Sequence, residues 1–186
     1  MESTEKNKVC SVERARVLDI SLRKLIHNPN KMLKPFIKEG MTVMDLGCGP
    51  GFFTFEMAKL VGPTGKVTAV DLQDGMIEIV RKKITNSILE KNIELHKCQN
   101  DKIGLSKTFD FILIFYMLHE VPDQSIFLQE VFSLLNPGGI VLISEPKFHV
   151  TESDFDKSKK ILRNIGFEII EEPKVFFSRS VVIKRA

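Results

Sequence analysis

The sequence has few cysteines, no long apolar run and no secretory leader, and each shortage argues against a class of protein. Its three cysteines, Cys10, Cys48 and Cys98, form no CxxC pair and no zinc-finger spacing. Reduced thiols are therefore expected, although a bond between two of them depends on distances that a sequence does not give. No apolar run reaches the length of a membrane span, and the N-terminal "MESTEKNK" lacks the apolar core of a secretory signal. These absences predict a cytoplasmic protein with no membrane partner.

The chain also has little excess charge of either sign. The 186 residues carry a net charge of only +3, and lysine and arginine are scattered along the chain. The sequence therefore gives no electrostatic reason to expect nucleic acid or an anionic membrane as a partner. With 43% hydrophobic and 27% charged residues, the composition is that of an ordinary globular protein of about one domain.

What the chain does contain is a regular alternation of short apolar runs and helical patterns. Strands are expected at 41–47, 66–72, 93–98, 109–117, 140–145, 167–173 and 178–184. Helices are expected at 12–26, 32–40, 52–62, 74–88 (with Ile88 turned inward), 122–135 and 151–166, the last ending at Gly166. The turn "NPGG" should precede the strand at 140–145.

This alternation predicts an α/β fold. Strands that alternate with helices form a parallel sheet with helices on both faces. The last two runs are separated by too few residues for a parallel crossover, so they must pair antiparallel. The expected architecture is a doubly wound, mostly parallel, seven-stranded sheet with an antiparallel C-terminal hairpin.

The stretch "VMDLGCGPGFF", residues 43–53, forms the first turn from strand to helix, where open parallel sheets bind ligands. Its G-x-G-x-G spacing is one residue shorter than the dinucleotide fingerprint, and no Walker Gly-Lys-Ser/Thr follows. Asp45, just before the loop, would repel a pyrophosphate but attract an ammonium. Asp71, at the end of the next strand, could accept hydrogen bonds from both hydroxyls of a ribose. A cofactor with an adenosine, no phosphate and an amino-acid end is S-adenosylmethionine.

The motifs resemble those of class I S-adenosylmethionine-dependent methyltransferases. "VMDLGCGPGFF" and "VTAVDL" are similar to the opening motifs, "FDFILIFYMLHEVPD" to the fourth-strand motif, and "LLNPGGIVLISEP" to the turn and strand after it. The similarity runs in order from about Met32 to the C-terminus. It implies an N-terminal helical lid segment at 1–35, which would bring Cys10 or His27 near the cofactor, and an S-adenosylmethionine-binding methyltransferase domain at 36–186.

The resemblance also implies which residues hold the cofactor. Asp71 would hold the ribose, Leu72 and Met76 would pack near the adenine, and the backbone around Phe115 would meet the methionine amino group. The family's aspartate after the third strand is missing from "KCQNDKIGL". The contact to the adenine amino group is thus left open among Gln99, Asn100 and Asp101. The methionine end would be contacted by Asp45 and by the loop residues Gly47, Cys48, Gly49 and Gly51.

The sulfonium already carries an activated methyl, so the protein has to supply mainly position and the exclusion of water. The acceptor is expected above residues 115–120. The catalytic candidates there are His119 and Glu120, as base or acceptor-orienting groups, and Tyr116, which could instead pack in the core. His119 could equally cap the helix near Asp123 or pack on Tyr116. His149 could line the acceptor site or cap the helix that begins near Thr151.

The sequence argues against some classes of methyl acceptor but does not identify the acceptor. No Asn/Asp-Pro-Pro-Tyr/Phe motif follows the fourth strand and no proline precedes a cysteine, which argues against amino-methylation of bases or glutamine and against cytosine C5 chemistry. A small-molecule acceptor, methylated by direct displacement, is favoured. A nicotinamide-dependent oxidoreductase, a non-catalytic cofactor-binding domain and a macromolecular acceptor remain alternatives. A metalloid acceptor held by Cys10, Cys98, His119 and His149 is another, but their spacing predicts no metal site, and the sequence does not indicate an oligomeric state.

Overall fold

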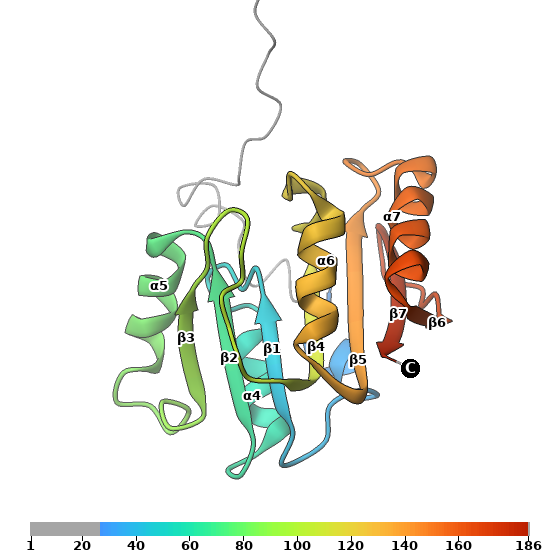
Figure 1. Ribbon diagram of the computed structural model, residues 1–186. Coiled ribbons are helices and arrows are strands. Elements are labelled where there is room, and N and C mark those ends of the chain that lie inside the picture. Colours follow the sequence, from blue (N-terminus) through green and yellow to red (C-terminus); the bar gives the residue numbers. More distant parts are fainter. Residues whose placement is uncertain (1–26, 186) are drawn as a thin grey trace, which may run out of the picture.

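The computed structural model describes residues 27–185, which form one seven-stranded sheet with the order β3-β2-β1-β4-β5-β7-β6 (Figure 1). Each predicted strand is present. The bounds are β1 Thr42–Leu46, β2 Lys66–Asp71, β3 Ile93–Lys97, β4 Phe109–Phe115, β5 Leu135–Pro146, β6 Phe167–Glu171 and β7 Ser178–Arg185.

The pairing matches the doubly wound fold expected from the sequence. β1 pairs in parallel with both β2 and β4, so the order of the strands reverses at β1, while β7 runs antiparallel to its neighbours β5 and β6. The apolar runs of β1 and β4 are buried on both faces, as central strands of a parallel sheet must be. The reversal places the ends of β1 and β4 on either side of the switch point, where such sheets hold ligands.

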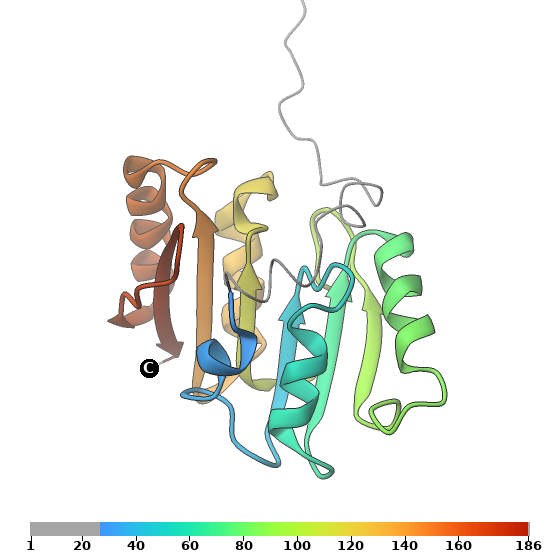
Figure 2. The same ribbon diagram turned by 180° about the vertical axis from the view of Figure 1, so that it is seen from behind.

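Helices cover both faces of the sheet. α3 (Pro29–Leu33), α4 (Thr54–Val61) and α5 (Asp74–Ile84) lie on the face seen in Figure 2, and α6 (Gln124–Ser133) and α7 (Glu152–Ile165) lie on the face seen in Figure 1. Each face has its own core. Leu33, Met57 and Val80 belong to the first, and Leu128, Val131 and Leu162 belong to the second.

The ends of the helices follow local chemistry. Asn28 caps α3 by accepting a hydrogen bond from the Lys31 N–H, and Pro29 occupies the first turn, where its missing N–H costs nothing. Thr151 caps α7, and Gly166 ends it with a φ of 111°, as predicted. The predicted helix at 12–26 lies outside the described residues.

Three expectations about local structure are wrong. The helix expected at 32–40 is the short α3, which begins at Pro29 and ends at Leu33. The helix predicted to reach Ile88 stops at Ile84, because Thr85 leaves the helical conformation with a ψ of 127° and Asn86 follows with a left-handed φ of 60°. Ile88 is therefore 89% exposed. β5 begins before the "NPGG" turn rather than after it. The extra residues form an irregularity, since Phe109 pairs with Leu135 and Phe111 with Ile140.

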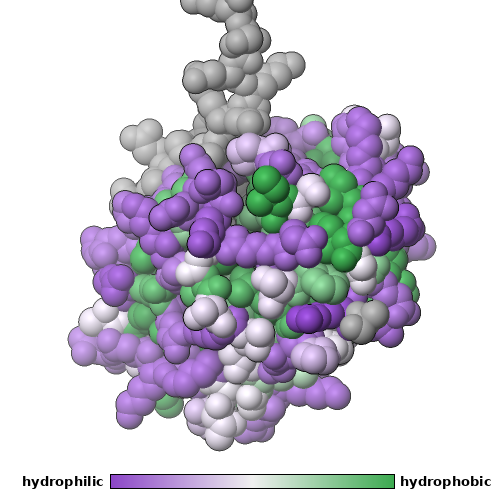
Figure 3. Space-filling model, viewed as in Figure 1, coloured by the Kyte–Doolittle hydropathy of each residue, from purple (hydrophilic) through white to green (hydrophobic). Residues whose placement is uncertain are grey.

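Hydrophilic residues surround scattered apolar patches on the face that Figure 3 shows. Within residues 27–185, no helix combines the length and the apolar character that crossing a membrane requires.

Candidate active site

The glycine loop folds onto the end of β2 at the carboxyl edge of the sheet. The N–H groups of Gly47 and Cys48 both donate to the Val70 carbonyl, and the N–H of Gly51 donates to the Cys48 carbonyl. The three loop glycines have φ values of 80°, 52° and 88°, a left-handed region that glycine enters without steric cost. The spacing of the motif is therefore a requirement of this backbone path.

Asp71, at the end of β2, is hydrogen-bonded to the loop. Its Oδ2 accepts a hydrogen bond of 2.8 Å from the Gly49 N–H, and its Oδ1 accepts one of 2.9 Å from the Gln73 N–H. Burial raises the pKa of this carboxyl group, and the backbone N–H donors oppose that rise. Each carboxylate oxygen has a second lone pair, so Asp71 can still accept hydrogen bonds from a ligand.

Asp45, near the end of β1, is bonded to the helix that follows the loop. It is 2% exposed, and its Oδ2 accepts a 2.6 Å hydrogen bond from the Thr54 hydroxyl at the start of α4. This bond fixes the helix whose positive end faces the site. The loop is also held from α5, where Lys83 Nζ donates to the Pro50 carbonyl.

Cys48 is a buried structural side chain. It is 5% exposed, and burial, assisted by the charges of Asp45 and Asp71, raises the pKa of its thiol far above the ordinary range. The thiolate is the reactive form, so Cys48 is inert as a nucleophile.

The glycines of the loop differ in the space around them. A Cβ added to Gly49 would meet no atom of residues 27–185 within 4 Å, whereas one added to Gly47 would lie 2.7 Å from Cγ of Met117. The open side of Gly49, next to the buried carboxylate of Asp71, is the cradle that an adenosine cofactor needs. The residues present therefore fit S-adenosylmethionine.

The residues predicted to contact the adenine lie in the segment after β2, including the first turn of α5, and in the loop after β3. Leu72 is half-buried and Met76 is 3% exposed, whereas Gln99, Asn100 and Asp101 are all exposed. Glu130 on α6 anchors this last loop, because its two carboxylate oxygens accept 2.8 Å hydrogen bonds from the N–H groups of Ile103 and Gly104.

The end of β4 forms an aromatic corner. Tyr116 has a left-handed φ of 59°, its N–H donates to the Ser144 carbonyl, and its ring stacks on Phe115 at 4.1 Å between centroids. The Tyr116 hydroxyl lies 2.9 Å from Nε2 of His27 and 2.6 Å from Oγ of Ser178. His27 thus contacts the aromatic corner, and Tyr116 joins β4 to β7.

Rings continue from this corner to His119. Phe148 lies edge-on to Tyr116, His149 lies 4.7 Å from Phe148, and the imidazoles of His119 and His149 stack at 5.5 Å. Phe148 and His149 are exposed, so these four rings, hereafter the ring arc, border open space at the carboxyl edge. Asp123 caps α6 and Thr151 caps α7, so neither histidine serves as a helix cap.

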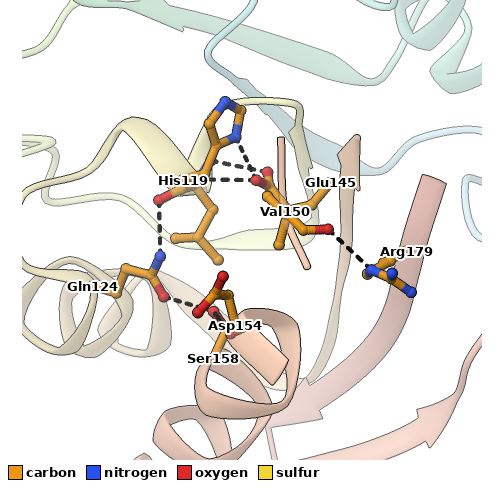
Figure 4. Close-up of polar contacts among 8 residues, drawn as sticks. His119, Gln124, Glu145, Val150, Asp154, Ser158 and Arg179 are labelled. Carbon is orange, nitrogen blue, oxygen red and sulfur yellow. Dashed lines mark hydrogen bonds and ion pairs between the residues drawn. The ribbon is translucent and has the colours of Figure 1, made fainter. Parts of the chain in front are cut away.

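His119 is held by a buried carboxylate. Glu145, at the end of β5, is 2% exposed, and its Oε2 lies 2.5 Å from Nδ1 of His119 (Figure 4). The same carboxylate accepts the backbone N–H groups of Leu118 and His119, which begin the short 3₁₀ helix η1 (Leu118–Glu120). Glu120 is half-buried on the same turn.

Two hollows flank this edge. One, of about 720 Å³, lies between α7 and the β6–β7 loop, and among the residues that line it are Phe155, Phe177, Ser178 and Arg179. Its residue Ser178 bonds the Tyr116 hydroxyl, so this hollow adjoins the aromatic corner. The other, of about 280 Å³, lies outside the glycine loop against Pro50 and Phe55.

The proposed soft-metal cluster gains no support from the described residues. Among residues 27–185, no group of three or more histidine, cysteine or acidic residues is placed to hold a metal ion. His119 and His149 do come together, but Cys10 lies outside the described residues.

Several residues that build the site escape a reading of the sequence. Three of the five contacts join positions more than 25 residues apart in the chain, and the other two span nine and six residues, so no motif spacing pointed to them. Thr54 contacts Asp45, Glu130 contacts the loop after β3, and Met117 contacts Gly47. Ser178 contacts Tyr116, and Gln124 contacts η1.

Comparison with known proteins agrees with this geometry. A family model described as a methyltransferase domain matches residues 37–172. The chain belongs to this family. It is a class I S-adenosylmethionine-dependent methyltransferase domain, as predicted, and its family cofactor is S-adenosylmethionine. The alternative of a nicotinamide-dependent oxidoreductase is therefore wrong.

Individual relatives show how far the similarity extends. The chain is 37% identical over 107 residues to a demethylmenaquinone methyltransferase of Lactococcus lactis, covering 57% of this chain and 42% of that protein. It is 31% identical over 140 residues to the ubiquinone/menaquinone biosynthesis C-methyltransferase UbiE of Pasteurella multocida, covering 75% and 50%. The chain thus spans about half the length of these curated relatives.

A solved structure matches almost the whole chain. A SAM-dependent methyltransferase from Aquifex aeolicus superimposes with a TM-score of 0.85 at 28% identity, covering 96% of this chain and 100% of that one.

Proposed function

We propose that this protein transfers the methyl group of S-adenosylmethionine to a small-molecule acceptor. The observation that carries the proposal is the clasp of Asp71 on Gly49, which sets a buried carboxylate beside the open side of the glycine loop at the switch point of the sheet. When bound there, the cofactor supplies a methyl group on a sulfonium, ready for displacement. The chain then has to hold it, place the acceptor and exclude water.

The acceptor is assigned to the edge formed by Tyr116, His119 and Glu120. The ring arc favours a planar aromatic acceptor, because aromatic rings pack well against one another in offset or edge-on contacts. The two curated relatives, named for demethylmenaquinone and for ubiquinone/menaquinone biosynthesis, are consistent with an acceptor of this chemistry. The hollow next to Ser178 provides space for substituents on the ring.

We further propose that residues 1–35 act as a lid over the cofactor and residues 36–186 as the catalytic domain. Support comes from His27, which precedes α3 and lies against both Tyr116 and Phe115.

Calorimetry with S-adenosylmethionine and S-adenosylhomocysteine tests the cofactor site. Asp71→Ala should weaken both affinities by about 1–3 kcal/mol, since it removes the acceptor of two backbone hydrogen bonds and of the ribose. Asp156→Ala, which removes an exposed aspartate on α7, is the matched control and should bind as the wild type does. A wild-type protein that binds neither compound would contradict the proposal. Labelled methyl transfer into a metabolite extract would then identify the acceptor.

A further inference from the structure

His119 of η1 and the buried carboxylate of Glu145 in β5 form a hydrogen-bonded pair in which the donor and the acceptor can be assigned. Glu145 receives three donors: the backbone N–H groups of Leu118 and His119 at 3.1 Å each, and Nδ1 of His119 at 2.5 Å. A carboxylate can only accept hydrogen bonds, so Nδ1 must carry the proton. In the neutral imidazole the lone pair then lies on Nε2.

Nε2 of His119 is directed away from Glu145 (Figure 4). It makes no hydrogen bond with any of residues 27–185, and the His119 side chain is 25% exposed. The ring lies at the end of the ring arc, at the edge where the acceptor is proposed to bind. A lone pair in that position is available to a substrate.

We propose that His119 is the proton acceptor of the transfer, that Glu145 is its positioning residue, and that the attacking atom of the acceptor carries a proton which it loses during transfer. The inference rests on the proposed function and adds to it the class of acceptor: a weakly acidic O–H or C–H group, rather than a thiolate or a metalloid lone pair. Glu120 is thereby assigned no proton-transfer role.

The step balances on the residues named. The attacking atom forms its bond to the methyl carbon as the carbon–sulfur bond breaks and leaves its electron pair on sulfur, and the proton of the attacking atom moves to Nε2. The imidazolium so formed is stabilised by the adjacent carboxylate of Glu145 and then releases its proton to water. This is the division of work between a base and its orienting carboxylate.

Three further contacts keep the pair in place. Gln124, at the start of α6, donates through Nε2 to the Leu118 carbonyl and accepts a hydrogen bond from the Ser158 hydroxyl of α7 through Oε1. Arg179 on β7, the residue that pairs with Glu145 across the sheet, donates to the Val150 carbonyl in the segment after β5 (Figure 4). Helices and sheet therefore both fix η1, as a positioned base requires.

The charges around His119 set the pH at which it can act. Burial lowers the pKa of His119, but the hydrogen bond and charge of Glu145 and the charge of Glu120 outweigh it, so the pKa lies above its ordinary value. Among residues 27–185, the stacked His149 also faces the ring. Because the base must be neutral, the rate should rise with pH through this raised pKa. Removing the Glu145 charge should move that rise to lower pH.

The first test needs no acceptor. Long-range ¹H–¹⁵N NMR of the histidine-labelled protein, with and without S-adenosylhomocysteine, reports the tautomer and titration midpoint of His119. We expect a neutral form with its proton on Nδ1 and a midpoint above that of free histidine. In Glu145→Gln the midpoint should fall. A neutral form with its proton on Nε2 would overturn the proposal.

The second test measures transfer from labelled S-adenosylmethionine to probes of each class: 1,4-naphthohydroquinone and catechol, dithiothreitol, and arsenite. With a hydroxylated probe, His119→Gln should lower kcat by roughly 10²- to 10⁴-fold, and Glu145→Gln by about tenfold or more with KM little changed. Glu145→Gln should also move the rising limb to lower pH. Glu168→Gln, an exposed carboxylate paired with Lys184, is the matched control and should behave as the wild type.

The outcomes separate this proposal from the proposed function. Transfer only to dithiothreitol or arsenite, transfer to none of the probes, or an unchanged kcat in His119→Gln would each overturn the role of His119. Calorimetric binding of S-adenosylmethionine by the same proteins shows whether the cofactor site stands independently. If the wild-type protein fails to bind it, the proposed function itself fails.

Discussion

At the scale of single residues, the glycines of the first loop differ in what they tolerate. A side chain at Gly47 would collide with Met117, whereas a Cβ at Gly49 would contact no atom in the part of the chain that the structure describes. We expect Gly47→Ala to lower the free energy of unfolding by about 1–3 kcal/mol through steric overlap and a strained φ. Gly49→Ala should cost about 1 kcal/mol, from its positive φ alone, yet weaken S-adenosylmethionine binding. Urea denaturation and calorimetry measure the two effects.

Met117→Ala provides the control for this comparison. Combined with Gly47→Ala, it removes the atoms that collide, so the double variant should recover part of the lost stability. It should give no such recovery with Gly49→Ala. Equal stability losses at the two glycines would contradict the distinction.

At the scale of elements, α6 controls the loop that follows β3. Glu130 accepts both the Ile103 and Gly104 N–H groups, and this fixes the backbone next to the predicted adenine contacts. Glu130→Ala should speed hydrogen exchange at these two amides and weaken cofactor binding by about 1 kcal/mol, the value of a typical hydrogen bond. Glu168→Ala serves as the control. Glu168 lies in β6, at the opposite edge of the sheet from β3, and its carboxylate pairs with Lys184 of β7. Unchanged exchange at residues 103 and 104 would disprove the anchoring role.

The same loop shows where sequence reasoning stops. Strands and helices follow from apolar periodicity, so β1 to β7 and the stop at Gly166 could be predicted, as could the glycine loop with Asp71. The exposure of Ile88 could not be predicted, because the chain leaves the helix at Thr85 and Asn86 although the apolar periodicity continues to Ile88. The partner of His119 and the partner of the loop after β3 could not be predicted either. Each of these hydrogen bonds spans about 26 residues and depends on how α6 and β5 pack.

At the scale of the whole molecule, the cofactor cradle joins two cores that lie on opposite faces of one sheet. Val61 on α4 belongs to one core and Val131 on α6 to the other, and both are fully buried. Val61→Ala and Val131→Ala should each lower the free energy of unfolding by about 2 kcal/mol, from lost apolar burial and the cavity left behind. Because strands β1 and β4 contribute to both cores, each variant should still unfold in one transition in urea.

Ligand binding then tests whether the two cores are one cooperative unit. S-adenosylmethionine at about 100 times its Kd should raise the free energy of unfolding by about 2.7 kcal/mol in the wild type and in both valine variants alike, because a ligand that binds only the folded state stabilises all that unfolds with its site. Helices on both faces of the sheet support the cradle, since Asp45 is bonded to Thr54 of α4 and Glu130 of α6 holds the loop after β3. A second urea transition, unmoved by the ligand, in the Val131→Ala variant would show instead that the α6–α7 face unfolds separately from the cofactor site.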